Sequence, residues 1–269
     1  LQSNYDFALT LPGNKQQQIA LASYDKKMYE LAYSVYLQAG DLNKAFILAS
    51  AAVKQDPTSR EWRTRLSQVA LWANNPVVSL KQYLYLAKHF NDEEAQKNGL
   101  RLAKQMKYEV VYAWFLHRDL KQNLKSEDTW KEYIDLLFKL GDIDKLSSEL
   151  NININNIPKE MYYNTFVRIY EIIDKPDEQL AALKKAVASL GPNPTYCMKM
   201  AEIYMDRDEL QNAWDIIQRG RKSYYPKSPE FWSTYIMVAY ANQKETEEVY
   251  ALKQLAYQKN PDASTFTRL

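Results

Sequence analysis

Glycine, cysteine and histidine are all scarce in this chain. Only 6 glycines occur among 269 residues, which argues against a β-sandwich, a phosphate-binding loop or a dinucleotide-binding turn, because each needs glycine at fixed positions. The one cysteine, Cys197, excludes an internal disulfide and a thiolate metal cage. His89 and His117 have no Cys or carboxylate motif at ligand spacing. We therefore expect two exposed structural histidines, an inert buried thiol and no metal site.

A strong charge of either sign is missing as well. The 35 Lys and Arg residues nearly balance the 33 Asp and Glu residues, which leaves a net charge of +2. This balance gives no nucleic-acid footprint. No run of 18 apolar residues occurs, so we expect no membrane span. Residues 1–6 lack the basic and apolar parts of a signal peptide and begin without Met, so we interpret the chain as a processed product or an excised fragment.

A pattern with a period of about 34 residues recurs along the chain. In "YLQAGDLNKAFILASAAVKQDP", residues 36–57, a tyrosine precedes a Gly-Asp turn, an apolar helical pattern and Asp-Pro. We call the place of this tyrosine the reference position of a repeat. The reference positions are occupied by Tyr36, Ala70, Ala103, Leu137, Tyr170, Tyr204 and Tyr240. Turn residues follow four places later, where one residue is expected to adopt a positive φ.

Each period contains two helical patterns, A and then B, which can bury their apolar faces only by stacking on neighbouring pairs. We therefore predict an all-α, right-handed α-solenoid of about seven helical hairpins over residues 26–263. Their expected bounds are 26–59, 60–92, 93–126, 127–159, 160–193, 194–229 and 230–263. We expect a partial repeat or capping helix in 1–25, with a helix near 15–23, and the start of a truncated repeat in 264–269. The poor helix former "NININNIP", residues 151–158, predicts a short helix B and an extended connector.

These columns resemble the tetratricopeptide repeat family, and this resemblance implies a non-enzymatic scaffold for protein–protein interaction. A narrower resemblance lies in "WRTRLSQVALWANNPVVSLKQYLYLAKHF", residues 62–90, following "AGDLNKAFILASAAVKQDP". This order is similar to the periplasmic repeat region of PelB-type outer-membrane exopolysaccharide secretion proteins. The likeness rests on Trp62, Arg65, Leu66, Val69, Ala70, Trp72, Pro76, Leu80 and Leu84.

The narrower resemblance implies a periplasmic assembly domain, part of a larger outer-membrane protein, that recruits a polysaccharide-modifying enzyme. Two alternatives stay open. The solenoid could bind an anionic or cationic polysaccharide directly and guide it to an outer-membrane pore. It could also be a general adaptor of an unrelated pathway, with a cytoplasmic location. None of these readings needs a catalytic residue or a cofactor.

The family resemblance also implies a partner-binding concave face, which is lined by fixed positions of the A helices. The predicted site residues are Lys97, Arg101, Lys104, Lys131, Asp135, Asn164, Arg168, Met198 and Glu202. The same positions add Glu171, Met205, Thr234 and Val238. The third repeat is basic there. Lys and Arg at this spacing are common on a merely solvated helix face, and an anionic or acidic contact is the alternative.

Aromatic residues fall into two groups by their place in the period. Those expected to fill the core are Tyr29, Tyr33, Tyr36, Trp130, Tyr163, Tyr170, Tyr204 and Tyr240. Those that fit the packing columns less well are Trp62, Trp72, Tyr162, Trp214, Tyr224, Tyr225 and Trp232. We expect some members of the second group to be exposed, where they would anchor a partner or stack on sugar rings.

Overall fold

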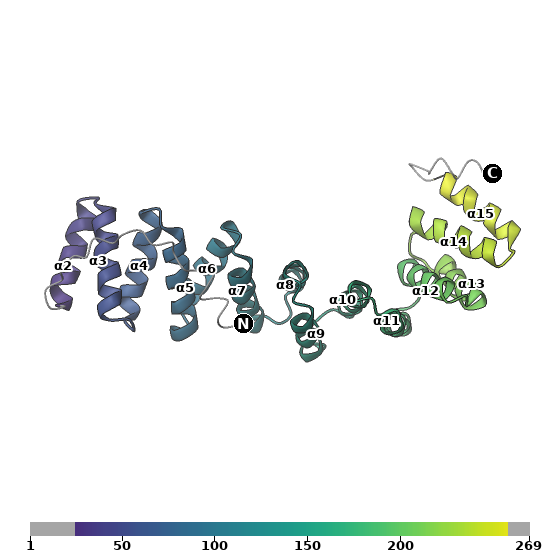
Figure 1. Cartoon of the computed structure of the whole chain (residues 1–269), viewed down its shortest axis with the longest axis horizontal. Coiled ribbons are helices and arrows are strands. Elements are labelled where there is room, and N and C mark those ends of the chain that lie inside the picture. The colour runs from purple at the N-terminus through teal and green to yellow at the C-terminus, as the bar shows by residue number, and fades with distance from the viewer. Residues whose placement is uncertain (1–24, 258–269) are drawn as a thin grey trace. The chain divides into compact units, whose positions relative to one another are not determined.

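The computed structural model describes residues 25–257, and within this range it contains helices and no strand (Figure 1). The predicted all-α class is therefore confirmed. The chain divides into two compact units between Gly141 and Asp142. The expected helix near 15–23 and the truncated repeat at 264–269 lie outside the described residues.

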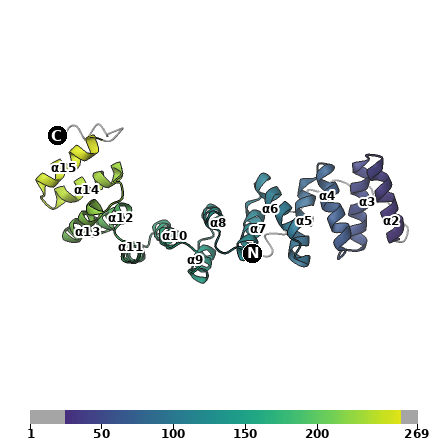
Figure 2. The same ribbon diagram turned by 180° about the vertical axis from the view of Figure 1, so that it is seen from behind.

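Unit 1, which ends at Gly141, contains α2 to α8. Their bounds are α2 Lys26–Gln38, α3 Leu42–Gln55, α4 Arg60–Trp72, α5 Pro76–Phe90, α6 Glu93–Gln105, α7 Glu109–Gln122 and α8 Glu127–Leu140. Its A helices are α2, α4, α6 and α8. Consecutive helices from α2 to α8 lie side by side, as Figures 1 and 2 both show. Side chains such as Trp62, Leu80 and Phe115 are fully buried between them.

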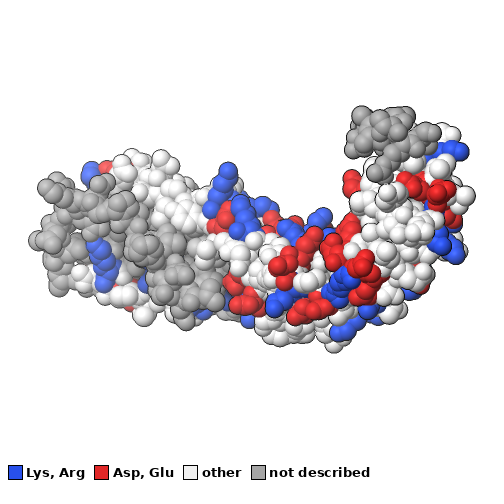
Figure 3. Space-filling view, turned by 45° about the vertical axis from the view of Figure 1, so that its right-hand side comes forward, with Lys and Arg blue, Asp and Glu red and all other residues white. Residues whose placement is uncertain are grey.

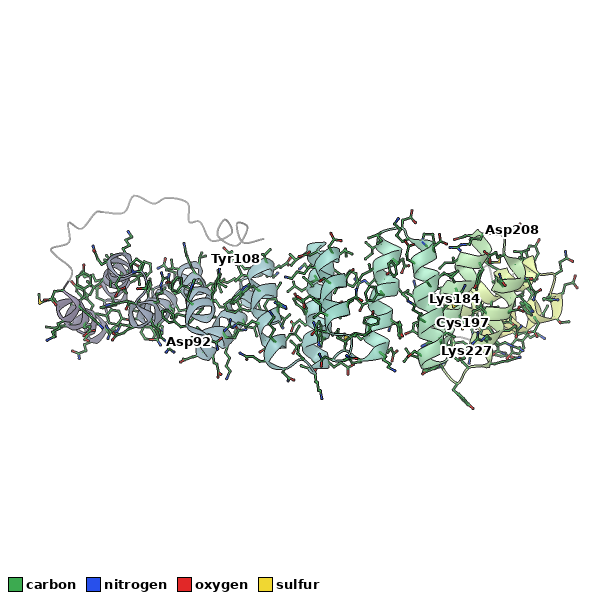
Figure 4. All side chains as sticks on the ribbon, turned by 90° about the horizontal axis from the view of Figure 1, so that it is seen from below. Asp92, Tyr108, Lys184, Cys197, Asp208 and Lys227 are labelled. Atoms are coloured by element: carbon green, nitrogen blue, oxygen red, sulfur yellow. The ribbon has the colours of Figure 1, made fainter. Side chains whose placement is uncertain are left out.

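Unit 2 starts at Asp142 and contains α9 to α15. Their bounds are α9 Ile143–Ile152, α10 Lys159–Ile172, α11 Pro176–Leu190, α12 Pro194–Asp206, α13 Leu210–Lys222, α14 Pro229–Ala241 and α15 Glu245–Ala256. Its A helices are α10, α12 and α14. Asp208 lies at one end of the α12–α13 hairpin and Lys227 at the other end, with Cys197 between them (Figure 4).

The turn from helix A to helix B has the same backbone geometry in every repeat. One residue of each turn has φ between 53° and 69°. These residues are Gly40, Asn74, Lys107, Gly141, Asp174, Asp208 and Gln243. In the second repeat the next N–H, from Asn75, donates to the carbonyl of Ala70 at 2.7 Å. This bond closes a Schellman turn and gives a hydrogen-bond donor to a carbonyl that would otherwise be unpaired at the helix end.

The same turn bond corrects the predicted register of the seventh repeat. The N–H of Lys244 donates to the carbonyl of Ala239 at 2.9 Å, so Ala239, and not Tyr240, occupies the reference position. Ala239 is fully buried, whereas 68% of Tyr240 is exposed. The prediction that Tyr240 fills the core is therefore wrong. The shift by one residue also buries Thr234 and Val238, which were expected on the partner-binding face.

Helix α9 and the connector after it confirm one expectation and overturn another. Helix α9 has 10 residues and is therefore short, as the sequence predicts. The connector is a turn and is not extended, because the N–H of Asn156 donates to the carbonyl of Asn153 at 2.8 Å. The Asn153 side chain also donates to the carbonyl of Glu149 at 2.9 Å. Asparagine bonds of this kind favour a turn over extended backbone.

Candidate functional site

The A-helix face of unit 1 carries the basic part of the predicted site. Lys97, Arg101 and Lys104 are exposed on α6, and Lys131 and Asp135 are exposed on α8. Their spacing along α6 places the three cations on one face of that helix. The structure therefore places the third-repeat cations on one exposed face of α6.

Lys104 has an additional role in holding neighbouring helices together. Its Nζ lies 2.5 Å from Oε1 of Glu132 on α8 and 5.7 Å from the ring centre of Tyr112 on α7. The hydrogen bond with Glu132 raises the pKa of Lys104. Burial raises the pKa of the Tyr112 hydroxyl to about 12. Partial burial would raise the pKa of Glu132, but hydrogen bonds from Lys104 and Tyr112 lower it. Both members of the pair therefore stay charged at neutral pH.

Two predicted residues of unit 2 also form a hydrogen bond with the next repeat. The Tyr196 hydroxyl donates to Oδ1 of Asn164 at 2.8 Å. The Thr234 hydroxyl donates to Oε1 of Glu202 at 2.9 Å. Asn164 and Glu202 are exposed, and each fixes its own A helix against the following one. Sequence spacing gave no sign of these bonds.

Two apolar residues of the unit 2 face were missed by the sequence analysis. Once Ala239 is the reference residue, Met237 and Tyr240 take the places that Glu202 and Met205 occupy on α12. Met237 is 54% exposed and Tyr240 is 68% exposed. The turn at residues 242–244 could have identified them. The reference residue of a repeat lies five places before the residue whose N–H closes the turn, here Lys244.

The second group of aromatic residues differs in burial, and Tyr162 and Trp214 are half-buried. Trp62 and Trp232 are buried, so a role for either as an exposed anchor is excluded. The Arg65 guanidinium lies 4.6 Å from the ring centre of Trp62 and covers it. Trp72, Tyr224 and Tyr225 are exposed, as expected for part of this group.

Cys197, His89 and His117 differ in burial. Burial raises the pKa of the Cys197 thiol to about 11, so it stays protonated at neutral pH. His89 is exposed beside Tyr85, with ring centres 4.2 Å apart. His117 is half-buried and stacks on Tyr133, which corrects the expectation that it is exposed.

Two further searches covered the described residues only. Among residues 25–257 no group of three or more His, Cys, Asp or Glu side chains is arranged to hold a metal ion. No helix in this range combines the length and the apolar character that crossing a bilayer requires.

Comparison with solved structures decides the type of fold. The C-terminal part of a TPR repeat-containing protein from Cytophaga hutchinsonii aligns with a TM-score of 0.50 at 8% identity, over 90% of this chain and 99% of that chain. The fold is that of a tetratricopeptide repeat solenoid. Residues 185–269 also match the family model described as tetratricopeptide repeat.

Another solved tetratricopeptide repeat protein, from Parabacteroides merdae, aligns with a TM-score of 0.40 at 12% identity, over 90% of this chain and 96% of that chain. No curated protein matches the chain. A tetratricopeptide repeat fold is typical of a non-enzymatic scaffold that binds protein partners.

Proposed function

We propose that this protein is a scaffold that binds a partner protein along the A-helix faces of its repeats. The observation that supports this most is the character of those faces. They carry exposed cations in unit 1, at Lys97, Arg101 and Lys131, and exposed apolar side chains in unit 2, at Met237 and Tyr240. Large exposed apolar side chains are typical of surfaces that bind other molecules, and a cluster of exposed cations attracts an acidic partner.

Photo-crosslinking from single positions tests this function in the full chain. A photoreactive amino acid at Lys131 on α8 would report on the A-helix face. The same amino acid at Lys81, exposed on helix B α5, is the matched control. We expect a discrete protein adduct from position 131 in cells that produce the chain naturally, and none from position 81. Equal labelling from both positions, or no protein adduct from 131, would contradict the scaffold.

The finer proposal is that the scaffold is the periplasmic assembly domain of an exopolysaccharide secretion system and recruits a polysaccharide-modifying enzyme. Its support is the resemblance of residues 62–90 to PelB-type proteins. Trp62, Leu66 and Val69, which carry part of this resemblance, are buried, so they would preserve packing and not contact the enzyme. Mass spectrometry of the adduct from position 131 tests the proposal, because an adduct with an unrelated cytoplasmic protein would contradict it.

A direct polysaccharide-binding function is the second candidate, and the loop between α13 and α14 favours it. Tyr224 and Tyr225 are exposed there, close in sequence to Arg219, Lys222 and Lys227. Exposed aromatic rings beside cations can stack on sugars and pair with acidic groups. Calorimetric titration with alginate fragments should give binding that Tyr224→Ala weakens at least about fivefold. Heat equal to that of dilution alone would rule this function out.

A further inference from the structure

Unit 2 exposes an apolar surface on two neighbouring A helices. We call it the Met–Tyr face and define it as Met198 and Met205 on α12 together with Met237 and Tyr240 on α14. The first two are half-buried, and the other two are 54% and 68% exposed. Helices α12 and α14 lie side by side in Figures 1 and 2. Because a thioether side chain is flexible and polarisable, methionine surfaces adapt to the apolar side chains of a partner.

Two hydrogen bonds fix the position of α14 relative to its neighbours. The Thr234 hydroxyl donates to Glu202 on α12 at 2.9 Å. The side-chain amide of Asn242 donates to the carbonyl of Leu210, at the start of α13, at 3.0 Å. Met237 and Tyr240 lie on α14 between these two attachment points. They are therefore held alongside the part of α12 that begins at Glu202.

The two cations close to the Met–Tyr face both form ion pairs with the preceding repeat. On α12, Lys199 pairs with Glu171 of α10 at 2.8 Å. Just after α12, Arg207 pairs with Asp177 of α11, also at 2.8 Å. Lys199 and Arg207 therefore neutralise carboxylates of the preceding repeat and not those of α12.

Two carboxylates of α12 remain. Glu202 and Asp206 are exposed, and neither forms an ion pair with any residue that the structure describes. Asp and Glu side chains lie among Lys and Arg side chains on the visible surface of unit 2 in Figure 3. The two carboxylates of α12 that have no ion-pair partner among the described residues would therefore attract an occupant that carries cations.

We infer that the Met–Tyr face binds a segment of a partner protein in which apolar side chains alternate with lysine or arginine. This inference rests on the proposed scaffold function and names the chemistry of the segment bound by unit 2. The apolar side chains pack on Met205, Met237 and Tyr240. The cations pair with Glu202 and Asp206. The hydrogen bond from the buried Thr234 hydroxyl holds the Glu202 carboxylate in position for this contact.

Fluorescence anisotropy with three labelled 12-residue peptides tests the inference on the full chain. One peptide contains Leu and Lys, the second has Glu in place of Lys, and the third has Ser in place of Leu. We expect measurable binding of the Leu–Lys peptide and at least tenfold weaker binding of the other two. Because the attraction is electrostatic in part, binding of the Leu–Lys peptide should weaken with added salt.

Matched variants locate the binding site. Met237→Ser combined with Tyr240→Ser should weaken binding of the Leu–Lys peptide at least tenfold. Glu202→Gln should weaken it about threefold, while the amide oxygen still accepts the Thr234 hydrogen bond. The control is Tyr257→Ser, which removes an exposed tyrosine just after α15, outside the Met–Tyr face. Unchanged circular dichroism melting curves would show that every variant is folded.

The inference is overturned if the Leu–Glu peptide binds as well as the Leu–Lys peptide, or if the control loses as much binding as the double variant. Its failure can be distinguished from failure of the scaffold itself. A protein adduct from position 131 without binding of the Leu–Lys peptide at the Met–Tyr face would support the scaffold function and contradict this inference. Absence of both the adduct and peptide binding would contradict both proposals.

Discussion

Gly99 shows how closely two helices of unit 1 approach each other. A Cβ atom at this position would lie 2.2 Å from Cζ of Phe115, which is fully buried on α7. Gly99→Ala should therefore lower the free energy of unfolding by about 1–3 kcal/mol, because the ring has to leave its place in a packed core. Urea unfolding followed by circular dichroism measures the change.

The double variant with Phe115→Leu is the control for this prediction. A smaller side chain at 115 relieves the clash, so Gly99→Ala should cost less in that background than in the natural chain. A neutral Gly99→Ala, or equal costs in the two backgrounds, would show that the ring does not limit the approach of α6 and α7.

Val35 and Val69 form a matched pair, because each precedes the reference residue of its repeat by one place. Val69 is fully buried, while 52% of Val35 is exposed. Val69→Ala should cost about 2 kcal/mol through lost burial and the cavity left behind. Val35→Ala should stay within about 0.5 kcal/mol of the natural chain. Urea midpoints of the two variants, compared directly, check this; similar losses would mean that the α2 surface is covered in solution.

At the scale of single elements, the A-to-B turn offers a stabilising substitution. Lys107 has a φ of 57°, in the left-handed region where a Cβ atom is strained. Lys107→Gly should therefore raise the free energy of unfolding by about 1 kcal/mol, because glycine adopts this conformation without strain. Thermal unfolding of Lys107→Gly beside Lys107→Ala separates relief of strain from loss of the lysine charge. A gain in both variants, or in neither, would contradict this explanation.

The repeat pattern was readable from the sequence because these turns recur at nearly constant spacing. Lys107, Asp208 and Gln243 adopt the same conformation as Gly40 without being glycine, so residue type alone could not find every turn. The error in the seventh repeat arose where Ala239 and Tyr240 stand side by side, since the tyrosines of earlier repeats favoured Tyr240. A slip of one residue rotates a helix by about 100°, which moves some side chains from the exposed face to the buried face and others in the opposite direction.

The candidate site was predicted only in part for a related reason. Helical spacing tells which side chains share a face, as it does for Lys97, Arg101 and Lys104 on α6. It cannot tell which of them reaches the next repeat, because that depends on the distance between stacked helices. The bonds from Lys104 to Glu132 and from Thr234 to Glu202 therefore became visible only in the structure.

At the scale of the whole molecule, stability is expected to be local. In a solenoid each repeat contacts mainly its sequence neighbours, so its stability depends on its own packing and on the adjoining interfaces. A change in one hairpin should weaken that hairpin and its neighbours and leave distant repeats unaffected. A single-core globular domain would instead lose stability throughout.

Gly220 provides the test of this locality. A Cβ atom there would lie 2.8 Å from Cβ of Cys197 on α12 and 2.9 Å from Phe231 on α14, so Gly220→Ala disturbs three helices of unit 2 together. Hydrogen exchange measured by mass spectrometry should become faster in α12, α13 and α14, while the peptides of α2 to α5 keep their rates. The exposed substitution Ala181→Ser on α11 should leave all rates unchanged. A uniform acceleration along the chain would contradict this prediction, because it would mean that all repeats open together as one cooperative unit.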